Sequence, residues 1–518
     1  MPAGTRDGPA MESQTMHHPA TDAPRLALPD AGLERALLKI ERARWAAAEF
    51  LKLGPAQTRQ IVAAVAEAAH GRAQAFAEAA VAETGMGVVA HKRQKNEACS
   101  RGLVEAYGHE DFVTPRIDAG RRMVGLPRPA GVVFALIPVT NPVATLYFKT
   151  LLALMTRNAI ILSPHPGARK VCTDAAHLLA EAARAAGAPD GAVQVIEEPT
   201  IPLIERLIGD PRVDLVVATG GPAVVQAAYR SGNPALGVGS GNAPVLVDDS
   251  ADLRAAARRI VASKSFDNSI LCTNESTLLA FDSVAAPLLD ALKSEGAHVC
   301  TPDEVARLRT TLFTPDGFAT GLIGKDAAAI AQAAGFRARD AKILLAPVDL
   351  VQPEEPLVRE KLCPVLAFAR VRGIDGAISA ARSMMRLSGR GHSAAIHSTT
   401  ETHILAFAAA LPALRLAVNT GCSLGASGYE THLGPSMTIG TGFAGGSSLA
   451  ENLTPHHLVQ EARIAYPSDA DAVFGQFEGL DPLALPRSPA PAPTDDADAM
   501  RRELRRLIRE ELDALLAA

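Results

Sequence analysis

Cys272 stands where a thiol could be presented for reaction. It ends the segment SKSFDNSILC (263–272), after a stretch of helical periodicity and a polar Asp-Asn-Ser turn. A cysteine thiolate is a strong nucleophile that can form and release covalent intermediates. A lone cysteine is also commonly a small buried apolar side chain. The residues by themselves therefore favour a buried structural cysteine over a reactive one.

Two further segments have the form of ligand-facing turns. LVVATGG (215–221) changes from strand to Gly-rich turn to helix, and the N–H groups of a helix N-terminus suit a diphosphate. IPVTNPV (137–143) ends a strand in Asn-Pro, which by itself predicts a turn. GVGSGN (237–242) imitates GxGxxG but lacks the last glycine and the strand-turn-helix context, so it predicts no dinucleotide fingerprint.

No pattern predicts a metal site, because no Cys-x-x-Cys pair or Cys/His cluster has the spacing of metal ligands. The cysteines are Cys99, Cys172, Cys272, Cys300, Cys363 and Cys422. The first residues lack the apolar stretch of a secretory signal, so we expect a cytoplasmic protein with reduced thiols.

The elements that must position these segments indicate an α/β protein. Short apolar runs alternate with helical stretches from about residue 131, which is typical of βαβ units around a buried parallel sheet. Two segments with helical periodicity, 31–54 and 58–85, each end in Gly and predict an N-terminal helical layer. A second α/β unit is expected from about 256 to 447.

Composition excludes several classes of protein. The chain has 518 residues, 48% of them hydrophobic, and its 51 Lys and Arg against 56 Asp and Glu give a net charge of −5. Without a basic excess, nucleic acid is not an expected partner. The longest apolar runs are about half a membrane span, so no membrane insertion is expected.

The two ends of the chain differ from the middle. Residues 1–29 predict a disordered arm, and the Pro/Ala-rich stretch 481–498 predicts a linker. Residues 499–518 predict an amphipathic helix whose apolar side chains share one face.

Several long motifs, in order, resemble the CoA-acylating branch of the aldehyde dehydrogenase family over roughly residues 31–475. They include GVVFALIPVTNPVATLYFKTLLALMTRNAIILSPHP, SKSFDNSILC, VREKLCPVLA and SGRGHSAAIHS. The resemblance is strongest to the aldehyde-oxidising half of bifunctional aldehyde-alcohol dehydrogenases. It implies an aldehyde dehydrogenase-like fold with two doubly wound lobes, one for the cofactor and one for catalysis, plus a small oligomerisation element.

The resemblance implies a role for each candidate residue. Cys272 matches the nucleophile, which adds to an aldehyde, expels hydride to nicotinamide and keeps the acyl group as a thioester. Asn141 matches the side-chain donor to the oxyanion, with the N–H of Cys272 as the second donor. His392 matches a histidine of the acylating subgroup that could assist the thiol or CoA. Asn419 and Thr420 match a motif that supports the pocket.

The resemblance also implies NAD as cofactor, with NADP left open because Ser163 replaces a lysine of hydrolytic relatives. Glu360 matches the glutamate that holds the nicotinamide-side ribose. The implied cofactor-binding residues are Thr140, Ser163, His165, Thr219, Gly220, Gly221 and Glu360.

CoA is the implied acyl acceptor. Hydrolytic family members carry a glutamate that activates water, and Val238 stands at the matching position here. General base catalysis contributes roughly 10²–10⁴-fold, enough for a thiol to outcompete unassisted water. We therefore expect acyl-CoA from a short aliphatic aldehyde such as acetaldehyde or propionaldehyde. The alternatives are an acylating sulfoacetaldehyde dehydrogenase, a hydrolytic aldehyde dehydrogenase and a catalytically silent assembly component.

The expected domains are a cofactor domain (30–255) with a hairpin-like oligomerisation insert near 115–129, a catalytic domain (256–447) and a closing segment (448–480). The family implies a homodimer or homotetramer. The C-terminal helix resembles encapsulation peptides, which suggests bacterial microcompartment shell proteins as partners; an oligomer-capping helix is the alternative.

Overall fold

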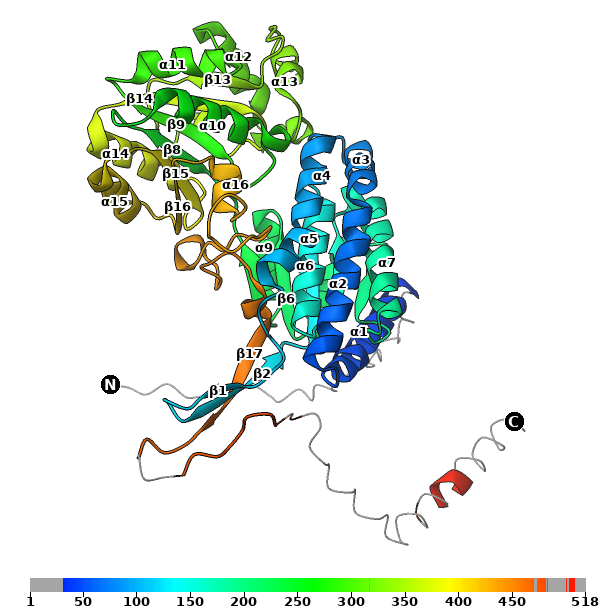
Figure 1. Cartoon of the computed structure of the whole chain (residues 1–518). Helices are drawn as coiled ribbons and strands as arrows, with labels where there is room; N and C mark the ends of the chain where they lie inside the picture. The colour runs from blue at the N-terminus through cyan, green and yellow to red at the C-terminus, as the bar shows by residue number, and fades with distance from the viewer. Residues whose placement is uncertain are drawn as a thin grey trace, which may run out of the picture.

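The computed structural model describes residues 31–315, 317–469, 473–480, 482, 500 and 503–507. The expected arm at 1–29, all but Pro482 of the linker at 481–498, and most of the helix at 499–518 lie outside the described residues. Within that last range, residues 500 and 503–507 are helical. The chain forms two lobes and a ribbon that projects from them (Figure 1).

The first lobe is built on a five-stranded sheet, all parallel, in the order β5-β4-β3-β6-β7. The strands are β3 (Val132–Ile137), β4 (Ala159–Pro164), β5 (Val193–Val195), β6 (Leu215–Thr219) and β7 (Ala235–Val238). The chain winds outward from β3 through β4 to β5, then returns to the other side through β6. Ligands of doubly wound sheets bind where the order reverses, here at the carboxyl ends of β3 and β6.

Helices cover both faces of this sheet and extend it into a helical layer (Figure 1). They are α1 (Ala31–Phe50), α2 (Pro55–Gly71), α3 (Ala73–Thr84), α4 (Val89–Ala98), α5 (Arg101–Tyr107), α6 (Pro142–Met155), α7 (Arg169–Ala185), α8 (Ile201–Ile208) and α9 (Pro222–Arg230). The second expected helical segment is broken at Arg72, which leaves helical geometry (φ −115°, ψ 10°) directly after Gly71. Glycine is a poor helix former, which favours a break there.

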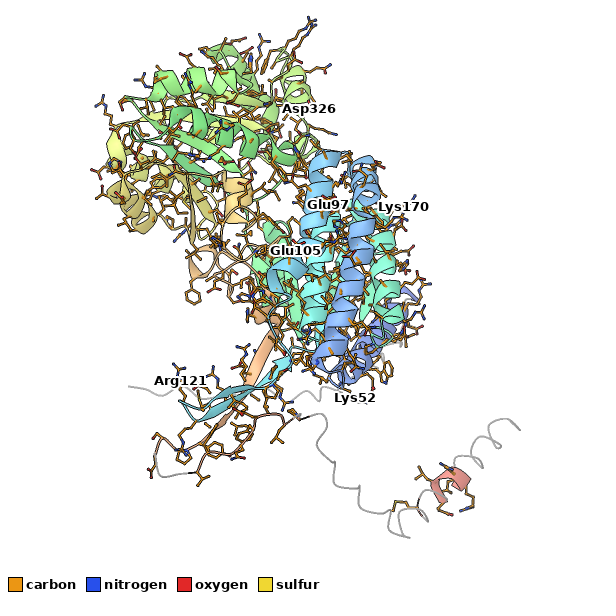
Figure 2. All side chains as sticks on the ribbon, in the orientation of Figure 1. Lys52, Glu97, Glu105, Arg121, Lys170 and Asp326 are labelled. Carbon is orange, nitrogen blue, oxygen red and sulfur yellow. The ribbon has the colours of Figure 1, made fainter. Side chains whose placement is uncertain are left out.

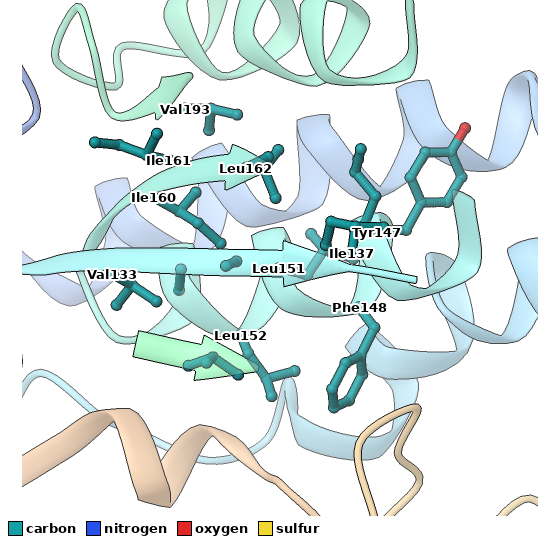
Figure 3. Packing of buried hydrophobic residues seen from close by; sticks show 14 of the residues in the cluster. Val133, Ile137, Tyr147, Phe148, Leu151, Leu152, Ile160, Ile161, Leu162 and Val193 are labelled. Carbon is teal, nitrogen blue, oxygen red and sulfur yellow. The ribbon is translucent and has the colours of Figure 1, made fainter. Parts of the chain in front are cut away.

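The core of the first lobe is continuous between the sheet and α6, every residue of which is buried. Figure 3 shows Phe148, Leu151 and Leu152 of this helix along β3, with Val133 and Ile137 of that strand in the same cluster. The uniformly apolar strands are those expected of a parallel sheet covered on both faces. Burial therefore fixes the position of α6, and with it the loop that enters the helix.

The second lobe carries a seven-stranded, all-parallel sheet in the order β10-β13-β14-β9-β8-β15-β16. Its strands are β8 (Ala243–Val247), β9 (Glu275–Phe281), β10 (Ala297–Val299), β13 (Ile343–Pro347), β14 (Val365–Val371), β15 (Ser393–His397) and β16 (Arg415–Val418). Its helices are α10 (Leu253–Ser265), α11 (Ala285–Ser294), α12 (Pro302–Leu312), α13 (Ala327–Ala333), α14 (Gly373–Met385), α15 (Glu401–Ala410) and α16 (Cys422–Ala426). A two-stranded hairpin, β11 (Phe313–Thr314) with β12 (Gly317–Phe318), follows α12.

The change of lobe lies earlier than the sequence suggested. β8 pairs with β9 and β15, so the chain crosses between the sheets at residues 239–242, the crossing loop, rather than near residue 255. Strand pairing decides the lobe to which β8 belongs, and its partners come later in the sequence. The two-lobe α/β architecture itself is confirmed.

A three-stranded antiparallel ribbon joins distant parts of the chain. β1 (Arg116–Asp118) and β2 (Met123–Pro129) form a hairpin, and β17 (Val459–Ala465) pairs with β2 from Met123 opposite Ala465 to Pro129 opposite Val459. The ribbon extends away from both lobes (Figure 1). These strands lie within the segments expected to serve oligomerisation, and that role stays a prediction.

Candidate active site

Cys272 follows a turn of unusual backbone geometry. After α10, three consecutive residues are left-handed: Asp267 (φ 49°), Asn268 (φ 52°) and Ser269 (φ 67°). Asp and Asn tolerate this region better than most residues. Such a strained run persists only where its surroundings hold it. Here the side chain of Asn268 donates to the Gly324 carbonyl at 2.9 Å, and the N–H of Asp267 donates to a ring nitrogen of His91 at 2.9 Å.

Cys272 is half-buried. Burial and, secondly, the charge of Glu360 together raise the pKa of this thiol to about 12, while the charge of Arg415 acts in the opposite direction. Without ligands the thiol is therefore protonated at neutral pH. Reaction requires a change that stabilises the thiolate or accepts its proton.

Asn141 lies next to this turn although it belongs to the other lobe. It is the residue before α6, at the carboxyl end of β3. Its Nδ2 donates to the carbonyl of Ile270 at 3.3 Å and to the hydroxyl of Thr140 at 3.2 Å, and its Oδ1 accepts from Lys95 Nζ. The structure thus brings together two residues that the sequence places far apart.

A buried charge cluster lies behind Asn141 and was missed in the sequence. Lys92 and Lys95 of α4 are each 3% exposed, and both bind Asp267 Oδ2, which is fully buried. Burial alone would raise the pKa of the Asp267 carboxyl, but the charges of Lys95 and Lys92 and its hydrogen bonds hold that pKa below the ordinary value. Glu97 of the same helix forms an ion pair with Arg93 on the outer face (Figure 2).

The crossing loop packs against Cys272. The Gly241 N–H donates to Glu360 Oε1 at 3.1 Å, and a Cβ placed on Gly241 would lie 1.8 Å from the Cys272 carbonyl oxygen. Burial raises the pKa of Glu360 to about 7, against the opposing effects of the Gly241 hydrogen bond and nearby lysines. The apolar Val238, at the end of β7, is buried just before this loop.

His392 is fully buried, directly before β15 of the second lobe. Its Nδ1 is 3.0 Å from the Ser393 hydroxyl, and among the described residues its Nε2 has no partner. Burial, and secondly the charge of Arg415, lower the pKa of His392 to about 3, which keeps the ring neutral. Arg415 donates to the carbonyls of Gly391 and Ala450 at 2.8 and 3.1 Å. Its charge thus acts on both His392 and Cys272.

The expected cofactor residues surround the reversal of the first sheet. Thr219 ends β6, and Gly220 and Gly221 lead into α9, with Gly221 as the residue before the helix. A Cβ on Gly221 would meet nothing within 4 Å, so open space faces this helix N-terminus. Ser163 is buried in the last part of β4, next to β3.

Thr140 follows β3 and His165 follows β4, so both lie at the carboxyl edge of the first sheet. The Thr140 carbonyl accepts from Lys92 Nζ at 3.0 Å. His165 is exposed as a residue, and its Nδ1 accepts from the N–H of Gly167 at 3.0 Å. Partial burial of its ring lowers its pKa. All seven expected cofactor residues except Glu360 therefore belong to the first lobe.

Asn419 and Thr420, the residues expected to support the pocket, form hydrogen bonds within the second lobe. Asn419 is left-handed (φ 53°), and its amide exchanges hydrogen bonds with the backbone of Ser398 at 2.7 and 3.0 Å. Thr420 donates to Glu430 at 2.9 Å. These bonds fix the end of β16 near the start of α16.

A family model described as the aldehyde dehydrogenase family matches residues 7–453. The chain belongs to the aldehyde dehydrogenase family. It is 34% identical over 433 residues to the bifunctional aldehyde-alcohol dehydrogenase AdhE of Escherichia coli K12, covering 82% of this chain and 49% of that protein. It is 35% identical over 479 residues to the acylating sulfoacetaldehyde dehydrogenase of Cupriavidus necator, covering 88% and 96%.

A crystal structure of an acetylating aldehyde dehydrogenase from Geobacillus thermoglucosidasius superimposes with a TM-score of 0.84 at 35% identity, covering 85% of this chain and 99% of that one. The chain spans about half the length (49%) of the bifunctional relative. The expected family and fold are confirmed. Among the helices that the structure describes, none is long and apolar enough to cross a membrane.

Proposed function

We propose that the chain is a CoA-acylating aldehyde dehydrogenase that converts a short aliphatic aldehyde, CoA and NAD⁺ to acyl-CoA, NADH and a proton. The observation that carries the proposal is the placement of the Asn141 amide beside the turn that presents Cys272. A nucleophile and an oxyanion donor, one from each lobe, meet there. Similarity to relatives named as acetylating or acylating supports the same reaction.

The Cys272 thiol loses its proton, which is the proton released in the overall reaction. Its Sγ then bonds to the aldehyde carbon while the carbonyl π bond breaks, and the oxygen becomes an oxyanion. The Asn141 Nδ2 and the Cys272 N–H are donors for that oxygen, and loss of one such donor typically lowers the rate about 10²–10³-fold. When bound, NAD⁺ supplies the acceptor for the hydride that leaves the carbon. The acyl group then remains on Sγ as a thioester until a thiolate of CoA displaces the sulfur.

Val238 supports CoA rather than water as the acyl acceptor. An apolar, buried side chain at this place offers no base to a water molecule. Exchange of one thioester for another changes little free energy, so the reaction is reversible. A solved propionaldehyde dehydrogenase of Rhodopseudomonas palustris is described with bound CoA and an acylated cysteine, and the chain is 27% identical to it.

The residues at the sheet reversal fit a dinucleotide. The open helix N-terminus at Gly220 and Gly221 suits the diphosphate. Glu360 would hold the ribose next to nicotinamide, close to the crossing loop that carries Gly241. These residues bind and orient the cofactor. The choice between NAD and NADP is tested by measuring both.

The test is NADH formation from a panel of aldehydes, including propionaldehyde and sulfoacetaldehyde, with and without CoA, followed by mass spectrometry of the product. We expect steady turnover only with CoA, and an acyl-CoA product. Cys272→Ala should abolish it, whereas Cys172→Ala, a buried thiol in α7, should not. Carboxylate formed briskly without CoA would favour a hydrolytic enzyme, and an active Cys272→Ala variant would displace the nucleophile.

We propose further that the chain is cytoplasmic, forms homodimers or homotetramers through its ribbon, and associates with microcompartment shell proteins through its C-terminal helix. In the described part of that helix, Leu504 and Leu507 are exposed. A similar solved structure is a propionaldehyde dehydrogenase from a Clostridium phytofermentans fucose utilisation microcompartment. Deleting 486–518 should leave activity intact and abolish co-purification with shells; unchanged co-purification would reject the tether.

A further inference from the structure

Lys95 makes two contacts that connect three segments of the chain. It lies on α4 of the helical layer, and its Nζ donates to Asn141 Oδ1 at the entrance to α6 and to Asp267 Oδ2 in the left-handed turn before Cys272. Its side chain is buried. The ammonium group therefore contacts Asn141 of the first lobe and the turn before Cys272 of the second lobe.

The chemistry of lysine fixes the orientation of the Asn141 amide. An ammonium group has only donors, so the atom of Asn141 that faces it must be the oxygen. The Nδ2 group then points the other way, where it donates to Ile270 O and Thr140 Oγ1 at 3.3 and 3.2 Å. Both distances are at the long end for N–H···O bonds. An oxyanion formed on Cys272 can therefore compete for one of these protons.

The charge of Lys95 also strengthens the donor. A cation at the oxygen end of an amide polarises it and makes its N–H a better donor, and this effect is larger in a buried, low-dielectric site. Asp267 balances the charge and holds the ammonium in place. Asn141 alone, as an isolated side chain at the entrance to a helix, would have neither a fixed orientation nor this polarisation.

We propose that Lys95 is a positioning residue that turns the Asn141 amide N–H toward the oxyanion on Cys272. This inference rests on the proposed function, because it assigns no step of its own. The ammonium of Lys95 binds Asn141 and Asp267 rather than Cys272, so it acts through Asn141.

Lys92 is a matched control. It lies one turn earlier on the same helix, is equally buried and binds the same carboxylate, at 3.3 Å, but its other contact is the Thr140 carbonyl at 3.0 Å and not the amide of Asn141. Lys92→Met and Lys95→Met each leave Asp267 with one lysine. Any loss that comes only from weakening the buried ion cluster should therefore appear in both variants.

The experiment is a double-mutant cycle on the NADH burst, which measures formation of the thioester before CoA is added. We expect Asn141→Ala to slow the burst about 10²–10³-fold and Lys95→Met about 10–100-fold, with KM for the aldehyde changed less than the rate. The double variant should be no slower than Asn141→Ala alone, because the two residues act as a unit. Lys92→Met should lose less and should multiply with Asn141→Ala.

The outcomes separate the two proposals. If the wild type gives no CoA-dependent turnover, the proposed function fails. If it does, but Lys95→Met loses no more than Lys92→Met or multiplies with Asn141→Ala, the positioning role is refuted. If circular dichroism shows Lys95→Met unfolded, Lys95→Arg keeps a donor and the charge; a burst within about tenfold of wild type supports the role, and a loss as large as that of Asn141→Ala overturns it.

Discussion

Gly241→Ala is the sharpest test of how the crossing loop holds the nucleophile. A Cβ at this position would lie 1.8 Å from the carbonyl oxygen and 2.8 Å from the carbonyl carbon of Cys272, and 3.2 Å from Glu360 Oε1. The first two contacts are with backbone, which cannot rotate away. Ordinary contact needs roughly 3.4 Å, so the loop and the Cys272 backbone must separate by more than about 1 Å.

The expected loss follows from that displacement. A misplacement of about 1 Å at a reacting group can lower the rate about 10²-fold. Overpacking of this kind also lowers the free energy of unfolding by about 1–3 kcal/mol. We therefore expect Gly241→Ala to be folded and to lose about 10²-fold or more in kcat/KM for CoA-dependent NADH formation.

Gly239→Ala is the control in the same loop. Its Cβ would lie 3.6 Å from the nearest atom, the Thr441 hydroxyl oxygen, which is ordinary contact. Its kcat/KM should stay within about threefold of the wild type, since no group must move. Thermal unfolding followed by circular dichroism checks that both variants are folded. A folded Gly241→Ala variant with activity within tenfold of Gly239→Ala would refute the reasoning.

Three further predictions concern charge. Glu360, with a pKa of about 7, is charged at pH 8.5 and then raises the pKa of the Cys272 thiol, so Glu360→Gln should speed alkylation of Cys272 by iodoacetamide about threefold or more at pH 8.5 and little at pH 6. Mass spectrometry measures the alkylation rates, and an equal variant-to-wild-type rate ratio at both pH values would contradict this. Because the pKa of His392 is lowered to about 3 in the folded protein, only the unfolded chain protonates this histidine between about pH 6.5 and pH 3, and the free energy of unfolding in urea should fall by about 1.4 kcal/mol per pH unit across that range. His392→Asn should remove this contribution to the pH dependence of stability. Asp267→Asn leaves two buried lysines without a carboxylate and should lower the free energy of unfolding in urea by about 3–5 kcal/mol. Asp290→Asn, in an exposed ion pair, should change it by less than about 1 kcal/mol, and similar losses in both variants would refute the contribution of the buried cluster to stability.

The sequence predicted the parts of the fold that depend on local pattern. The apolar runs of β3, β4 and β6 are visible because a strand buried on both faces carries few polar residues. β7 was missed because Ala235–Val238 is short and lies in a Gly-rich stretch. The membership of β8 in the second sheet depends on pairing with strands that come later, which no local pattern contains.

The candidate site was predicted for the residues that lie in family motifs and missed for those that act by tertiary placement. Lys92 and Lys95 stand in HKRQKNE, which has the composition of a solvated helix face. Only the burial of α4 against the turn at Asp267 makes them interior groups. The one local signal was the Asp-Asn pair of that turn, since both residues tolerate left-handed geometry.

The ribbon has a consequence for biosynthesis. β2 lies between β1 and β17, and β17 comes after both lobes in the sequence. A nascent chain leaving the ribosome therefore exposes one edge of β2 until nearly all of the two lobes has been made. An open strand edge can pair with another chain. During translation, the free edge of β2 is therefore exposed to pairing with neighbouring nascent chains on the same polysome. A protein that bound this edge until β17 was made would raise the yield of correctly folded protein.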